Sequence, residues 1–194
     1  MNAHTSRLYN FAFRGLLAEE ALDREGRRNR RLMNMADEEL AKKLALDVLD
    51  DVHVANARST SLVYTAIAAF ENSARALVTK TLMDKFQEEW WDKGASAGIR
   101  ERAQKRMEEE QSAKWHAQRG QDPINYTTFG DLKNMMQNNW DAFEDLIGAL
   151  AWVSGIFDVI ERSRNVIMHS GSLEREDIER LGMNIRDWVK QVGA

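Results

Sequence analysis

The residues in this sequence that are best suited to chemistry lie close together near its C-terminal end. Arg164 is followed directly by Asn165 and, five positions after the arginine, by His169. An imidazole can accept the proton of a ribose 2′-hydroxyl, and a guanidinium can stabilise the dianionic phosphorane that forms next. The asparagine adds amide donors. These residue types suit acid–base cleavage of a phosphodiester, a reaction that requires no metal ion.

A structural explanation of the same residues is also open. A histidine in the last turn of a helix lies beside unpaired carbonyls, and an arginine on an apolar stripe can be paired with an acid. Five residues turn a regular helix by about 140°, so Arg164 and His169 would not share a face in one chain. On spacing alone this structural explanation is the more common one, and a single molecule would form a poor site.

A helix over residues 150–168 is predicted to carry Arg164. The arginine falls in line with apolar residues that recur every three or four positions: Val153, Phe157, Ile160 and Met168. We expect Gly171 to end this helix in the left-handed conformation. Ser172 is then placed to cap a last helix over 173–190, whose buried face is predicted to be Ile178, Leu181, Ile185, Trp188 and Val189.

Longer helices are expected to hold this segment in place. Apolar spacing predicts helices over 6–25, 37–56 and 59–90, and the third has the strongest stripe: Val63, Ile67, Phe70, Ala74, Leu77 and Thr81. Glu71 and Arg75 are four residues apart, so they share a face at the edge of that stripe. A surface ion pair is one explanation of these two residues.

Residues 92–122 differ from their surroundings because they are dense in charge of both signs. We expect an exposed helix or an insertion there, with Met107 and Trp115 as its apolar anchors. Further along, Thr128 and Asp131 can begin a helix, since the hydroxyl caps free amides and the carboxylate suits the positive end of the helix dipole.

Composition places the chain in the all-α class. It has one proline in 194 residues, where average usage predicts about ten, and proline interrupts both helices and sheets. It has no cysteine, which excludes disulfides and thiolate chemistry. No apolar run approaches the ~20 residues of a membrane span, and the N-terminus lacks a secretory signal, so we expect a cytoplasmic protein.

Charge and residue usage also narrow the ligands. The net charge of −4 argues against indiscriminate coating of nucleic acid, although it leaves a local basic site open. Neither a glycine-rich phosphate loop nor a known metal motif is present. His53 follows two acids, but such a run is far more often a solvated helix face than a metal site. We therefore expect no metal and no cofactor.

An arginine-rich run over residues 24–31 offers a second way to contact nucleic acid. Guanidinium groups match phosphate oxygens, so four residues of the run are candidate RNA contacts: Arg27, Arg28, Arg30 and Arg31. A solvated loop is the more common explanation of such a run.

The ordered set of motifs resembles the HEPN superfamily, the nucleotide-binding proteins of higher eukaryotes and prokaryotes. Arg164-Asn165-x-x-x-His169 matches its RxxxxH signature, and residues 69–77, with Glu71 and Arg75, are similar to an early core helix with an ExxxR pattern. Further similar segments are Trp90-Trp91, Ile124-x-Tyr126-x-x-Phe129-Gly130-Asp131-Leu132 and Asn139-Trp140-x-x-Phe143. Together they resemble the branch found in eukaryotic transcript-surveillance endoribonucleases and bacterial relatives.

This resemblance implies an antiparallel helical bundle over residues 52–194, with residues 1–51 as an N-terminal helical extension. It also implies a homodimer in which two copies of the motif meet in one cleft. Active members are metal-independent endoribonucleases that leave a 2′,3′-cyclic phosphate and a 5′-hydroxyl. In that reaction Arg164 would stabilise the transition state, His169 would act as acid and base, and Asn165 would assist positioning.

The resemblance further implies supporting roles and partners. Glu71 would orient Arg164 or its neighbours, with Arg75 in support, and the partners would be RNA, a second copy and a regulatory or antitoxin protein. Members act as toxins, anti-phage effectors or RNA-processing enzymes. Toxins that pair with a nucleotidyltransferase antitoxin often carry a tyrosine two residues after the histidine. This chain has Gly171 there, so we do not expect that mode of silencing.

Two other classes of function remain open at this point. One is a non-catalytic HEPN module that binds RNA, a nucleotide or a partner protein, and the other is a plain helical scaffold. The position of His169 discriminates the catalytic function from these two classes. Two copies of His169 that face one cleft favour catalysis, whereas a histidine buried inside one chain disfavours it.

Overall fold

Helices make up the regular structure of the described residues, 37–193, of this computed structural model. Along the chain they are α3 (Asp37–Lys43), the 3-10 helix η1 (Leu46–Val48), α4 (Asp51–Phe86), η2 (Gln87–Glu89), α5 (Trp90–Gly94), α6 (Ala97–Ser112), η3 (Pro123–Tyr126), α7 (Phe129–Asn138), α8 (Trp140–Ile147), α9 (Leu150–Met168) and α10 (Arg175–Val192). No strand occurs among these residues, so the all-α prediction is confirmed. The predicted helix over 6–25 lies outside the described range.

The chain divides into two compact units, residues 1–55 and 56–194. In the first unit, the prediction of one continuous helix over 37–56 is wrong. Ala45 adopts a left-handed conformation (φ 52°) after α3 ends, and the Asp50 carboxylate accepts a hydrogen bond from the Val52 amide at 2.9 Å, which caps the start of α4. Five apolar side chains of this unit are exposed: Leu40, Leu44, Val48, Leu49 and Val52.

Helix α4 supplies the longest wall of the second unit. Its buried line contains Ile67, Phe70 and Ala74 as predicted, but then continues through Val78 and Leu82 rather than through Leu77 and Thr81. The helix ends at Phe86, earlier than predicted, because Gln87 adopts a left-handed conformation (φ 55°).

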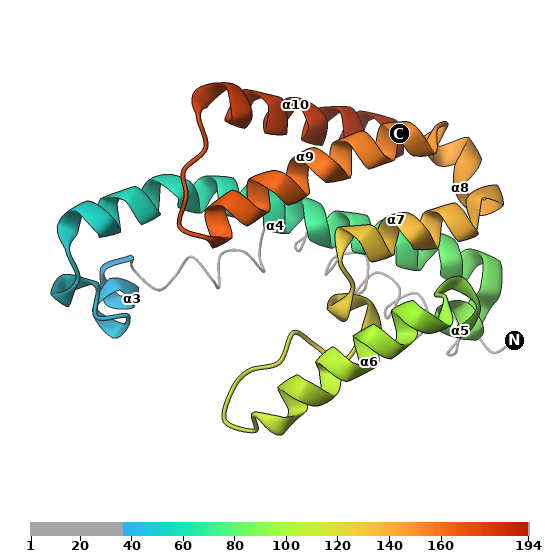
Figure 1. The fold of residues 1–194 in the computed structure, drawn as a ribbon, viewed down its shortest axis with the longest axis horizontal. Helices are drawn as coiled ribbons and strands as arrows, with labels where there is room; N and C mark the ends of the chain where they lie inside the picture. Colours follow the sequence, from blue (N-terminus) through green and yellow to red (C-terminus); the bar gives the residue numbers. More distant parts are fainter. Residues whose placement is uncertain (1–36, 194) are drawn as a thin grey trace, which may run out of the picture. The chain divides into compact units, whose positions relative to one another are not determined.

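An aromatic cluster joins four helices of the bundle. The ring of Phe70 on α4 lies 5.9 Å from that of Phe157 on α9 and 5.4 Å from that of Trp188 on α10. Phe129 at the start of α7 packs against Phe157 at 5.2 Å. Helices α9 and α10 run antiparallel and side by side (Figure 1). The early core helix α4 thus packs on the last two helices, α9 and α10.

The segment over residues 97–126 forms what we call the α6–η3 arm. Helix α6 buries Ile99 and Ala103, and the arm runs back along itself from α6 to η3 (Figure 1). Trp115 does not anchor it, contrary to prediction: its side chain is 87% exposed, and its ring contacts that of the neighbouring His116. The buried side chains of Ile99, Ala103, Ile124 and Tyr126 hold the arm, together with polar contacts to Asp131.

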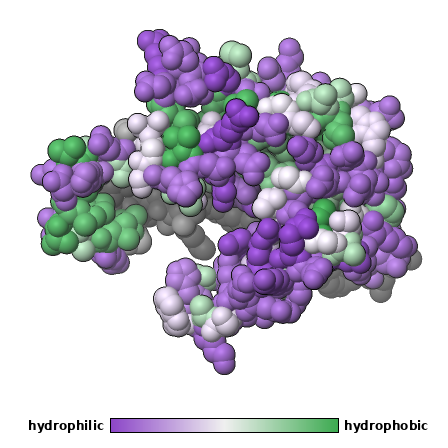
Figure 2. All heavy atoms as spheres, viewed as in Figure 1, coloured by the Kyte–Doolittle hydropathy of each residue, from purple (hydrophilic) through white to green (hydrophobic). Residues whose placement is uncertain are grey.

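Helix α10 starts two residues later than predicted. Its N-cap is Glu174 rather than Ser172, and no side chain caps it. Leu181 and Trp188 are buried as predicted, whereas Ile178 and Val189 are exposed. Figure 2 shows hydrophilic side chains over most of the visible face of the molecule. Within the described range, no helix has both the length and the apolar character that a membrane crossing requires.

Candidate functional site

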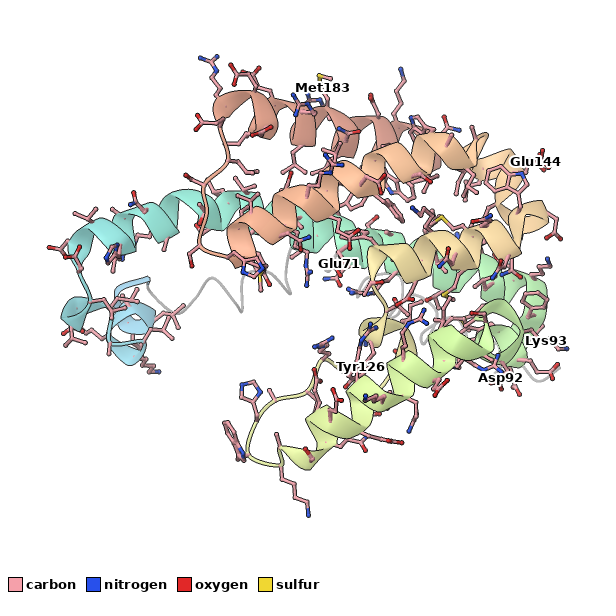
Figure 3. All side chains as sticks on the ribbon, in the orientation of Figure 1. Glu71, Asp92, Lys93, Tyr126, Glu144 and Met183 are labelled. Atoms are coloured by element: carbon pink, nitrogen blue, oxygen red, sulfur yellow. The ribbon has the colours of Figure 1, made fainter. Side chains whose placement is uncertain are left out.

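Glu71 connects Arg75 and Arg164, three residues that the sequence singled out. Its carboxylate lies 2.5 Å from Nη2 of Arg75, one turn along α4, and 3.7 Å from Nε of Arg164 on α9. The side chains of Glu71 and Arg75 are each 15% exposed, so the explanation of these two as a surface ion pair is wrong. Arg164 is 40% exposed. Figure 3 labels Glu71 where α4 passes α9 and α7.

Arg75 is fixed on several sides. Besides Glu71, its guanidinium donates to the Thr127 carbonyl at 3.2 Å and to the Asn72 side chain at 3.3 Å. Its Nε atom is buried and has no hydrogen-bond partner within the described part of the chain. A guanidinium presents five N–H donors, and the Nε donor of this one has no access to solvent.

A polar pocket of about 490 Å³ opens beside this group, between α4, α9 and the α6–η3 arm. Arg75, Arg106, Arg119 and Arg164 line it, together with Glu71, Glu161 and several uncharged residues: Tyr64, Asn72, Asn125, Tyr126, Thr127, Thr128 and Phe129. Four cations thus face two acids. The lining residues alone have an excess of two positive charges, and two acids outside the lining, Glu110 and Asp131, contact Arg119 and Arg106.

Asp131 fixes the arm that forms one side of this pocket. Its carboxylate accepts hydrogen bonds from Arg102 at 2.6 Å and from Arg106 at 3.4 Å, and it completes the predicted capping box with Thr128. Burial alone would raise the pKa of Asp131. The hydrogen bonds from Arg102 and Thr128 outweigh burial and lower that pKa below its usual value. The carboxylate therefore stays charged and holds both arginines.

Arg119 is also positioned from two sides. Its Nε lies 2.6 Å from the Glu110 carboxylate, and its guanidinium lies over the Tyr126 ring at 5.6 Å. The Arg119 backbone N–H also donates to Glu110, and this bond lowers the pKa of the Glu110 carboxyl. The Tyr126 hydroxyl donates to the Gly120 carbonyl at 3.1 Å, which ties the loop to η3. Tyr126 is labelled in Figure 3.

His169 lies at the end of α9, in a turn set by hydrogen bonds. The Ser170 amide donates to the Ile167 carbonyl at 3.0 Å and the Gly171 amide to the Val166 carbonyl at 2.8 Å, which is the Schellman pattern. The left-handed residue is Ser170 (φ 62°), not Gly171 as predicted.

Gly171 is required for a different reason. A Cβ at this position would lie 2.9 Å from the Val166 carbonyl oxygen and 2.8 Å from a Val166 methyl group. The backbone thus approaches itself too closely for any side chain to fit without movement.

The structure brings some of the predicted site residues together and separates others. Arg164, Glu71 and Arg75 form one contacting group, as described above. His169 is exposed and does not line the pocket, and Asn165 is exposed as well. Arg164 and His169 are thus apart in one chain, as their five-residue spacing predicts. The imidazole of His169 makes no hydrogen bond or ion pair within residues 37–193.

The sequence raises two further kinds of candidate residue, those of the arginine-rich run and metal ligands. The candidate RNA contacts Arg27, Arg28, Arg30 and Arg31 lie outside the described residues. Over the described range, no group of three or more histidine, aspartate or glutamate residues is placed to hold a metal ion. Sequence reasoning missed Arg106 and Arg119 as pocket residues. The available signal was weak, since both lie in a segment where charges of either sign are frequent.

Comparison with known proteins agrees with this arrangement. The family model of Swt1-like HEPN domains matches residues 65–193, which contain the Glu71–Arg164 contact, His169 and every pocket residue except Tyr64. No curated protein and no solved structure matches the chain. The resemblance drawn from the motifs is thereby confirmed: the chain belongs to the Swt1-like HEPN family.

Proposed function

We propose that this protein is an endoribonuclease that cuts RNA without a metal ion, at a site shared by two copies of the chain. HEPN domains are in general ribonuclease or nucleotide-binding modules. In the proposed reaction, the imidazole of His169 takes the proton of a ribose 2′-hydroxyl, whose oxygen then bonds to the adjacent phosphorus. The bond from phosphorus to the 5′-oxygen breaks. That oxygen takes a proton from the protonated imidazole of His169 in the second copy.

The placement of Arg164 is the observation that carries this proposal. Its guanidinium is tethered by Glu71 at 3.7 Å, yet 40% of its side chain is exposed beside a positively charged pocket. Glu71 contacts the Nε side of the guanidinium, so the remaining donors of this part-exposed side chain are open to solvent. Arg164 thus keeps donors available to stabilise the phosphorane, while the α9 packing and Glu71 limit its motion.

Exposed apolar residues beside the motif support a shared site. Val166 and Met168 on α9 are 40% and 56% exposed, and Ile178 on α10 is 43% exposed. A second copy that covered these side chains would remove apolar surface from water. It would also bring a second His169 toward Arg164, which solves the geometric problem that one helix leaves.

Digestion of single-stranded RNA in the presence of EDTA tests the proposal. We expect the wild-type chain to cut RNA but not the matching DNA, since DNA lacks the attacking hydroxyl. Mass spectrometry should find 2′,3′-cyclic phosphate ends. His169→Ala should lower the rate by about 10²–10⁴, Arg164→Ala by a similar factor, and Asn165→Ala by less. His116→Ala removes another exposed histidine and should leave the rate unchanged.

A loss of activity caused by unfolding must be distinguished from one caused by the missing side chain. His169 and Asn165 are exposed, so their replacement should leave the thermal midpoint near that of the wild type. Arg164 contacts Glu71, so its variant needs a thermal midpoint beside each rate. Cleavage of DNA at a similar rate, a requirement for magnesium, or full activity of a folded His169→Ala variant would each refute the mechanism.

A non-catalytic module that binds RNA, a nucleotide or a partner protein is the second candidate. The pocket favours it, because four arginines line a cavity that His169 does not enter. RNA binding without cleavage by the dimer would support this candidate. As a cellular role we propose a toxin or anti-phage effector in the cytoplasm. Phage plating efficiency with and without His169→Ala would test that role.

A further inference from the structure

The polar pocket contains more positive charge than the cleavage mechanism uses. Of its four arginines, Arg164 alone belongs to the RxxxxH motif, and Arg75, Arg106 and Arg119 have no assigned part in the reaction. The first two of these have internal partners that fix their positions: Arg75 contacts Glu71 and Thr127, and Arg106 donates to the Tyr126 carbonyl at 2.5 Å. Rigid, preorganised guanidinium groups around one cavity are typical of an anion site.

The donors that remain free point to a specific kind of anion. Arg106 is 30% exposed, and within the described residues only its Nη1 is engaged, by Tyr126 and Asp131. Arg119 is 56% exposed, with Glu110 engaging its Nε, so its terminal nitrogens can reach a ligand. Glu71 already contacts two arginines. The planar fork of arginine pairs with two oxygens of one anion, which phosphate and carboxylate offer and halide does not. Several arginines around one cavity favour phosphate, because it has more acceptor oxygens than a carboxylate.

The position of the pocket relates this anion to the proposed reaction. His169 lies five residues beyond Arg164 on α9, a rise of roughly 7 Å along the helix axis. Arg164, at one end of this stretch of helix, lines the pocket, and the imidazole of His169 lies at the other end. Because Arg164 itself lines the pocket, an RNA strand whose reacting phosphate lay between Arg164 and the second copy's His169 would bring a neighbouring phosphate to the other arginines of the pocket.

We propose that this pocket, lined by Arg75, Arg106 and Arg119, is a subsite that binds the backbone phosphate of a nucleotide adjacent to the cleaved one. The inference rests on the proposed ribonuclease function, and it assigns the α6–η3 arm a role in holding the substrate. The subsite binds the RNA backbone and does not read the base.

Substitution of Arg119 tests the subsite with the least risk to the fold. Arg119→Gln removes one charge from the pocket, but the variant keeps the backbone N–H that donates to Glu110. Lys114→Gln is the matched control, since it removes one exposed charge from the same loop outside the pocket. The probe is a fluorescein-labelled single-stranded RNA whose 2′-hydroxyls are all methylated, so binding is measured without cleavage.

We expect Arg119→Gln to weaken binding of this probe about tenfold at low salt. The slope of log affinity against log salt concentration should become shallower by about 0.7, the value for one phosphate contact on a single strand. Lys114→Gln should change both quantities much less. With cleavable RNA, Arg119→Gln should raise KM while leaving kcat close to that of the wild type.

The outcomes separate the two proposals. Cleavage by the wild type, with equal RNA affinity and salt slope for both variants, would overturn the subsite and leave the ribonuclease standing. Weaker probe binding by Arg119→Gln in a protein that never cuts RNA would support the subsite and refute the ribonuclease. AMP binding is measured for the same two variants. If Arg119→Gln lost AMP binding but kept RNA binding, the subsite would also be overturned, because the pocket would then take free nucleotides.

Discussion

Replacement of Asp131 by asparagine should loosen the α6–η3 arm without disturbing the aromatic core. The carboxylate of Asp131 is 5% exposed and accepts hydrogen bonds from Arg102, Arg106 and the Thr128 amide, the last at 3.0 Å. Asparagine has nearly the same shape but no charge. It keeps one acceptor oxygen and turns an NH2 group toward donors that cannot accept from it.

The size of the effect follows from these contacts. Loss of the helix cap costs about 1 kcal/mol, and loss of a hydrogen bond to a charged group costs about 1.5–3 kcal/mol. Arg102 is 51% exposed and can be hydrated after the change, so the larger penalty of a stranded buried ion does not apply. With one acceptor retained, we expect a loss of about 2–3 kcal/mol in the free energy of unfolding. The thermal midpoint should fall by roughly 4–12 °C for a chain of this size.

Urea denaturation followed by circular dichroism measures this change, and its pH dependence tests the cause. The pKa of Asp131 is lowered in the folded state, so its stabilising effect is complete above the unfolded pKa of about 3.9. The effect is lost as the pH falls through the folded value. The difference between wild type and Asp131→Asn should therefore be constant near neutrality and shrink below about pH 4.

Asp158→Asn provides the control for this experiment. Asp158 is 59% exposed and lies 3.8 Å from Lys133, so its replacement should change the stability by less than about 0.5 kcal/mol. The reasoning is refuted if Asp131→Asn costs no more than this control. It is also refuted if its cost stays the same below pH 4, in the range where the wild type still unfolds cooperatively.

Two further predictions concern the end of α9 and the oligomer. Ser170→Gly should raise the free energy of unfolding by about 0.5–1 kcal/mol because Ser170 is left-handed, whereas Gly171→Ala should lower it because the new Cβ meets the Val166 carbonyl. Thermal unfolding of both variants measures these changes, and a stabilised Gly171→Ala would contradict the described turn. Light scattering should find a mass of twice 22.3 kDa. A monomer at tens of micromolar protein would remove the shared site.

Features set by neighbouring residues could be predicted from the sequence. The capping box of α7 depends on Thr128 and Asp131, which are three positions apart, and both partners are visible in the chain. The bounds of α9 follow from its apolar spacing and the residues that end it. In each case the forces act within one or two turns, so the residue types carry the necessary information.

Contacts between distant segments could not be predicted in the same way. Asp131 contacts Arg102 and Arg106, which precede it by more than one helical segment in the sequence. Glu71 on α4 contacts Arg164 on α9, far along the chain. Arg102 and Arg106 look like any other charge in their helix, since a polar pair leaves no periodic signal. Arg164 stands out by its place on an apolar stripe, which predicts a partner but does not identify the acid. Trp115 illustrates the opposite error, because an apolar residue among charges resembles an anchor yet is 87% exposed here. The pairing of Glu71 with Arg164 was expected from family resemblance rather than from spacing.

The close approach at Gly171 has a consequence for how such a protein can be controlled. In the toxins that an antitoxin silences by nucleotidylation, the tyrosine two residues after the histidine accepts the modification. Here that position lies against the Val166 carbonyl, with no space for a first side-chain carbon. A tyrosine could be introduced only by opening the turn that holds His169. The backbone thus closes this route to covalent control, and any covalent modification that silenced this chain would have to use a residue other than 171.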